Sequence, residues 1–113
     1  MKLADIVEQI SVDPRKLTDY ALNFESPWGR HKALVFKQAL GFTQQNYADL
    51  LTQIKQQAME TEATFHSKDE FGERYTVDLI VQGTEERQGV VRTGWFVPRG
   101  SHQARLVTLY VRR

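Results

Sequence analysis

The chain has 113 residues, a charged fraction of 26% and a formal net charge of +1. This length predicts a single domain over residues 1–113, large enough to bury about two-thirds of its unfolded surface. The absence of cysteine excludes disulfides and thiolate metal ligands. No apolar run reaches the ~18 residues of a membrane helix, and the first residues lack the apolar region of a signal peptide. We therefore expect a cytoplasmic protein without membrane contact.

Positive charge is concentrated in the last quarter of the sequence. Residues 83–113 hold six arginines and two glutamates, a net charge of +4, whereas residues 1–82 hold nine basic and twelve acidic side chains, a net charge of −3. The guanidinium group is a planar fork of donors that matches phosphate or carboxylate. Two interpretations stay open, namely a solvated strand edge or a face that binds a polyanion.

Helical signals come first in the chain. A helix over 12–23 is expected to begin at an Asp-Pro pair, and a helix over 29–40 follows a Ser-Pro pair. A third helix, over 44–58, shows a regular apolar stripe. Residues 2–10 fit either a short helix or a strand.

From residue 60 on, the hydrophobic period changes to two, which is typical of strands. Strands are expected over 62–68, 73–82, 88–98 and 103–113, and their short connections predict an antiparallel meander. The predicted fold is therefore α+β, with two principal helices packed on one face of a four-stranded antiparallel sheet. The residues expected to be deeply buried are Phe36, Leu40, Leu51, Ile54, Leu79 and Val107.

The last strand decides which side chains reach the face that the helices leave free. Val107, Leu109 and Val111 form a fully apolar set that is expected to face the helices. Alternation then turns Thr108 and Tyr110 to the opposite face.

Lys32 is the unusual residue of the helix over 29–40. On a helical wheel it falls about 20° from the middle of an apolar arc, where a charge is costly unless it is paired. Its ammonium either reaches past the helix end or enters a cleft, where it meets a phosphate or a carboxylate such as Asp78. We expect the cleft, with the ammonium within reach of Thr108 or Arg92. The sheet face that carries Arg92 stays open.

The segments GRHKALVF (29–36), LGF (40–42) and LVTLY (106–110) resemble a family of small uncharacterised bacterial domains, found alone or as tails of toxin-like proteins. The resemblance covers the chain from about Lys16 to Val111. That family is similar to the barnase–EndoU–colicin–RelE class of ribonucleases, which place helices ahead of a four-stranded antiparallel sheet. The resemblance implies an attack of a ribose 2′-hydroxyl on its neighbouring phosphate, carried out by side chains without a metal.

The candidate catalytic residues are Lys32, His31, Arg92 and Thr108, and the candidate binding residues are Arg30, Trp95 and Tyr110. Lys32 and His31 fall in a first helical turn, where free backbone N–H groups favour an anion. Arg92 would supply charge to the phosphate and Thr108 a hydrogen bond. His66 and His102 are weaker candidates because no partner is evident from their spacing. No cofactor is expected, and the three histidines are too widely spaced for a local metal motif.

A hypothesis from another class fits the same residues. A non-catalytic module could dock an acidic protein or neutralise a toxin as its immunity protein. The net charge of +1 favours this hypothesis, because domains that bind RNA nonspecifically are usually more basic. The predicted partner is thus RNA or a cognate protein, and the question of enzymatic activity stays open.

Overall fold

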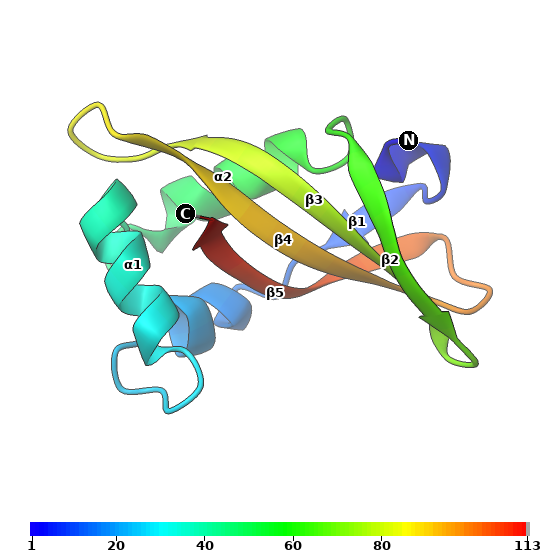
Figure 1. The fold of residues 1–113 in the computed structure, drawn as a ribbon, viewed down its shortest axis with the longest axis horizontal. Coiled ribbons are helices and arrows are strands. Elements are labelled where there is room, and N and C mark those ends of the chain that lie inside the picture. Colours follow the sequence, from blue (N-terminus) through cyan, green and yellow to red (C-terminus); the bar gives the residue numbers. More distant parts are fainter. Residues whose placement is uncertain (113) are drawn as a thin grey trace.

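A computed structural model describes residues 1–112, so the last residue of the strand expected over 103–113 lies outside the described part. A long, twisted sheet is flanked by helices at one end and across one face (Figure 1). In chain order the elements are η1 (Leu3–Asp5), β1 (Gln9–Ser11), η2 (Lys16–Ala21), α1 (Arg30–Leu40), α2 (Tyr47–Gln57), β2 (Ala63–Asp69), β3 (Gly72–Gln82), β4 (Gln88–Pro98) and β5 (Gln103–Arg112). No helix in this range is long and apolar enough to cross a bilayer.

The sheet has five strands in the order β1-β5-β4-β3-β2. Strands β2 to β5 form the expected antiparallel meander. The prediction of a four-stranded, purely antiparallel sheet is nevertheless wrong, because β1 adds a parallel pair in which Gln9 lies opposite Gln103 and Ser11 opposite Arg105. A strand of three residues is too short to show a hydrophobic period, and its partner lies at the other end of the chain.

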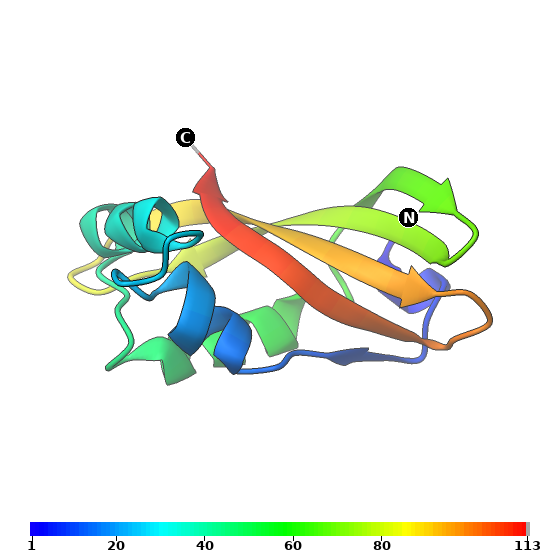
Figure 2. The ribbon, with the colours of Figure 1, turned by 90° about the horizontal axis from the view of Figure 1, so that it is seen from below.

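The two principal helices, α1 and α2, form close to the expected positions. Figure 2 shows α2 and η2 on one side of the sheet, whereas α1 lies at its end, beside the final part of β5. The prediction that both principal helices pack on one face of the sheet is therefore wrong for α1. Gln57 on α2 donates to the carbonyl of Ile80 at 3.0 Å. The backbone N–H of Thr84, in the β3–β4 turn, donates to the carbonyl of Leu40 at 2.8 Å. The sheet therefore fixes the C-terminal end of α1.

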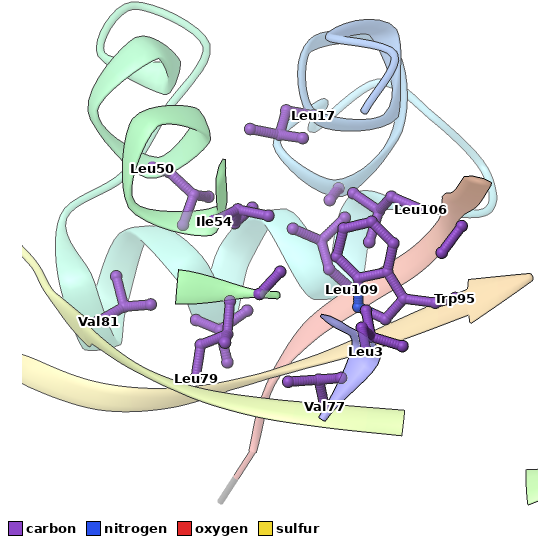
Figure 3. Packing of buried hydrophobic residues seen from close by; sticks show 14 of the residues in the cluster. Leu3, Leu17, Leu50, Ile54, Val77, Leu79, Val81, Trp95, Leu106 and Leu109 are labelled. Atoms are coloured by element: carbon purple, nitrogen blue, oxygen red, sulfur yellow. The ribbon is translucent and has the colours of Figure 1, made fainter. Parts of the chain in front are cut away.

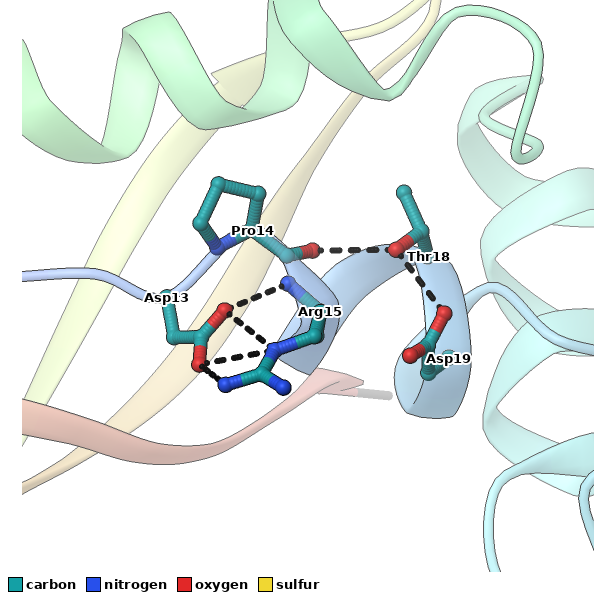
Figure 4. Close-up of polar contacts among 5 residues, drawn as sticks. All are labelled: Asp13, Pro14, Arg15, Thr18 and Asp19. Atoms are coloured by element: carbon teal, nitrogen blue, oxygen red, sulfur yellow. Dashed lines mark hydrogen bonds and ion pairs between the residues drawn. The ribbon is translucent and has the colours of Figure 1, made fainter.

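The helix expected over 12–23 forms only the short η2. Its geometry is of the π type, with the Leu22 N–H donating to the carbonyl of Leu17 at 2.8 Å. Asp13 precedes it, and its carboxylate accepts bonds from the backbone and side chain of Arg15 (Figure 4). The hydrogen bond from the Arg15 side chain lowers the pKa of Asp13 to about 2.

The core lies between the sheet, α2, η2 and α1 (Figure 3). The expected deep burial of Phe36, Leu40, Ile54 and Leu79 is confirmed, whereas the prediction for Leu51 is wrong, because this residue is only half-buried. The prediction for Val107 is wrong, since 40% of this residue is exposed.

A β-bulge explains the error at Val107. Gly94 pairs with Thr108, but the next residue, Trp95, pairs with Leu106. The extra residue, Val107, turns outward, so that Leu106 and Leu109 both point into the core despite their odd separation. Beyond the bulge, Thr108 and Tyr110 take the face that alternation predicts.

Candidate functional site

The candidate site lies on the outer face of the sheet, which we define as the face turned away from α2. Strand register places its side chains in cross-strand rows. The rows are Asp78, Arg92 and Tyr110; then Thr76, Gly94 and Thr108; then Arg74, Phe96 and Arg105. A hollow of about 290 Å³ lies at the middle row and is lined by His66, Arg92, Thr108 and Tyr110 among others. The sheet thus gathers residues of four strands, β2 to β5, around one concave surface.

Gly94 keeps the floor of this hollow open. A Cβ atom at this position would lie 2.9 Å from Cγ2 of Thr108, closer than carbon atoms pack without repulsion. A side chain at position 94 would therefore push Thr108 away from its observed position.

Lys32 reaches the edge of the hollow from the first turn of α1. Its Nζ donates to Thr108 Oγ1 at 3.0 Å and also to the hydroxyl of Tyr20. The same Nζ lies 4.7 Å from the ring centroid of Tyr20 and 5.5 Å from that of Tyr110. The expected approach of Lys32 to Thr108 is confirmed. Within residues 1–112, no carboxylate forms an ion pair with this ammonium.

Tyr20 is the residue of this cluster that the sequence does not predict. It lies on η2, and Thr18 two positions earlier bonds back to the Pro14 carbonyl at 3.4 Å (Figure 4). Burial raises the pKa of the Tyr20 hydroxyl. Hydrogen bonding with Lys32 and Thr108, together with the charge of Lys32, outweighs burial, and the pKa of Tyr20 is lowered. A tyrosine that ionises more easily beside an ammonium is suited to accept a proton.

Arg92 lies on the outer face, which settles the question that the sequence left open. Its Nε and Nη2 atoms donate to the two carboxylate oxygens of Asp78 at 2.8 and 2.9 Å, and Arg112 donates to the same carboxylate at 3.0 Å. The hydrogen bond from Arg92 lowers the pKa of Asp78, and the bond to Asp78 raises the pKa of Arg92. One carboxylate therefore balances part of the charge of two arginines.

The remaining candidates are dispersed. His31 is exposed and shares a shallow depression with Lys32 and Tyr110. Arg30 is exposed at the start of α1, and its side chain has no ion-pair partner among the described residues. Trp95 is completely buried, and its indole N–H donates to Thr93 Oγ1 at 2.7 Å. Trp95 is therefore a core residue and presents no surface to a ligand, contrary to our expectation.

The two other histidines differ in their positions. His66, on β2, lines the hollow opposite Thr108 and Tyr110. His102 is exposed in the β4–β5 turn, where its carbonyl accepts the N–H of Glu8 at 2.8 Å. Over residues 1–112, no group of three or more histidine, aspartate and glutamate side chains is placed to hold a metal ion.

Fold and site define a small α+β domain with a cationic and aromatic surface on the free face of its sheet. Residues 2–113 match the family described as Domain of unknown function (DUF6883), and the chain belongs to this family. No curated protein and no solved structure matches the chain. The association with toxins and the ribonuclease class therefore stay predictions.

Proposed function

We propose that this domain is a metal-independent ribonuclease that cleaves single-stranded RNA on the outer face of its sheet. The observation that carries the proposal is the contact of Lys32 with Tyr20 and Thr108 at the edge of the hollow. This contact combines a phenol of lowered pKa, a positive charge and a hydroxyl donor, which are the groups that phosphodiester cleavage needs.

The reaction divides between the two sides of the hollow. Tyr20, as phenolate, accepts the proton of the ribose 2′-hydroxyl, and the 2′-oxygen forms a bond to phosphorus. The bond from phosphorus to the 5′-oxygen breaks, and protonated His66 gives its proton to this oxygen. Lys32 and Arg92 stabilise the charge on the phosphorane. The products are a 2′,3′-cyclic phosphate and a 5′-hydroxyl.

A synthetic single-stranded RNA, incubated with the protein in EDTA, tests this proposal. We expect fragments that end in a 2′,3′-cyclic phosphate, and no fragments from the 2′-deoxy version of the same oligonucleotide. Lys32→Met should lower the rate by about 10²-fold or more. Lys37→Met is the matched control, because Lys37 is exposed on the same helix and lies over the Phe24 ring rather than at the hollow. Intact RNA with the wild type, or equal rates for the wild type and Lys32→Met, would contradict the proposal.

The second candidate function is binding of a protein partner without catalysis. Two observations favour it: the carboxylate of Asp78 already pairs with both Arg92 and Arg112, and large apolar side chains are exposed on this side of the sheet. Ile80 is 57% and Val107 40% exposed, which is typical of an interface that a partner covers. This function would be favoured over the first if RNA stays intact and if the affinity of the domain for RNA does not change with salt concentration.

A further inference from the structure

A second cationic cluster lies next to the hollow on the outer face. Phe96 on β4 pairs across the sheet with Arg74 on β3 and with Arg105 on β5. The guanidinium carbons of Arg74 and Arg105 lie 4.9 and 5.5 Å from the Phe96 ring centroid. Because the two arginines come from opposite neighbouring strands, one aromatic ring holds a guanidinium on each side.

The charge of this cluster is only partly balanced. Arg74 forms an ion pair with Asp69 at 2.8 Å, whereas Arg105 has no ion-pair partner in the part of the chain that the structure describes. Stacking on a ring uses the face of a guanidinium and leaves its N–H donors free. The donors of the exposed Arg105 are therefore available to an anion.

The cluster and the hollow are adjacent. Arg74 itself lines the hollow, and Phe96 follows Gly94 by two residues on the same face of β4, a distance of about 6.8 Å along an extended strand. One nucleotide step of an extended RNA can bridge this distance. An RNA whose reacting phosphate lies at Lys32 and Thr108 therefore brings its neighbouring phosphate to Arg74 and Arg105.

We infer that Arg74, Phe96 and Arg105 form a binding site for the phosphate next to the scissile one in a single-stranded RNA. Arginine is suited to this task because its donors match two phosphate oxygens at once. Phe96 holds the two guanidinium groups apart and orients them without neutralising them. The inference rests on the proposed function and extends it, because it requires a substrate of at least three nucleotides for full affinity.

Binding of uncleavable RNA tests the inference apart from catalysis. Labelled 2′-O-methyl dinucleotides and trinucleotides are titrated with the protein at several salt concentrations, and binding is followed by fluorescence anisotropy. For the wild type we expect the third nucleotide to raise affinity several-fold. Arg105→Gln should remove this gain. It should also make the negative slope of log K against log salt shallower by about 0.7, the value for one phosphate contact on a single strand.

Two further variants make the result specific. Phe96→Leu keeps both charges but removes the ring, so it should lose part of the gain. Lys55→Gln removes one positive charge from the exposed side of α2, on the opposite face, and should keep the whole gain. If Arg105→Gln and Lys55→Gln behave alike, the inference is wrong while the ribonuclease proposal stands. If the wild type binds neither oligonucleotide, the inference and the ribonuclease proposal are both wrong. If it binds the dinucleotide and the trinucleotide but leaves unmodified RNA intact, only the catalytic proposal is wrong.

Discussion

Lys32 Nζ lies 3.0 Å from Thr108 Oγ1, although 76 positions separate the two residues in the chain. The contact joins the first turn of α1 to the middle of β5, and Tyr20 connects η2 to the same ammonium. Two successive elements, η2 and α1, thus meet the remote strand β5 at one charged group. Each of these side chains contributes both to the packing of the domain and to the site, and variants can separate the two contributions.

Tyr20→Phe should keep the ring over which Lys32 lies and remove only the hydroxyl. We expect this variant to cleave RNA about 10²-fold more slowly than the wild type, because the proton acceptor is lost. The pH profile of the wild-type rate should contain the ionisation of Tyr20, and the profile of the residual rate of the variant should lack it. Initial rates over a range of pH values measure both effects, and a variant that retains the wild-type profile would exclude Tyr20 as the base.

The difference in stability between the wild type and Tyr20→Phe should also depend on pH. The pKa of Tyr20 is lower in the folded state than its ordinary value of 10.0, so the native state releases this proton at a pH at which the unfolded chain still holds it. The stabilisation that depends on the ionisation of Tyr20 is therefore absent below the lowered pKa and grows as the pH rises towards 10.0. Urea unfolding of wild type and Tyr20→Phe should show a difference in free energy that increases over this range. A difference that shrinks as pH rises would contradict the lowered pKa.

Gly94→Ala should disturb the site through Thr108. The added Cβ would lie 2.9 Å from Thr108 Cγ2, so the Thr108 side chain must shift, which disturbs the contact of its hydroxyl with Lys32. We expect a loss of about 1–3 kcal/mol in the free energy of unfolding and a lower rate of RNA cleavage. Thr108→Ser removes the opposing methyl group and keeps the hydroxyl, and the double variant should recover both quantities. If the double variant is no better than Gly94→Ala alone, the clash is not the cause.

Asp78→Asn should tighten RNA binding, because it frees Arg92 and Arg112 from their shared carboxylate. Affinity should rise and depend more steeply on salt, since more counterions are released. Asp49→Asn makes the same charge change on the exposed side of α2 and should have a smaller effect. Equal effects of the two substitutions would indicate that only the net charge matters.

Acid should remove the stabilising effect of Asp78. The pKa of this carboxyl is lower in the folded state than its ordinary value of 3.8, so the ion pairs contribute fully above 3.8 and are lost as pH falls through the lowered pKa. The free-energy difference between the wild type and Asp78→Asn, measured by urea unfolding, should therefore decrease below 3.8. A constant difference down to the lowest pH at which the protein folds would show that Asp78 stabilises by another route.

Part of the site was predictable because it depends on local periodicity. The helical wheel singled out Lys32, and alternation along β5 placed Thr108 and Tyr110 on the free face of the sheet. Both patterns span only a few residues, and the structure keeps them intact. The approach of Lys32 to Thr108 followed from combining them.

The rest depends on features that leave no periodic signal. The bulge at Val107 adds one residue to β5. For the residues of β5 that precede Thr108, each side chain therefore lies on the face opposite to the one that alternation predicts. Tyr20 reaches Lys32 from a short π-type helix, for which the spacing of an α-helix gives the wrong direction. Trp95 is predicted as a binding residue, but it lies in the core, where Thr93 Oγ1 accepts the hydrogen bond of its indole N–H.

The parallel pair between β1 and β5 sets an order of events during synthesis. Gln9 lies opposite Gln103 in this pair, so β1 remains unpaired while nearly the whole domain is being translated. Closing so long a loop costs conformational entropy before any hydrogen bond compensates for it. The edge of the sheet beside β5 is therefore completed last. If the ribosome pauses before β5, both β1 and the edge of β4 lack their strand partner and are open to misassembly.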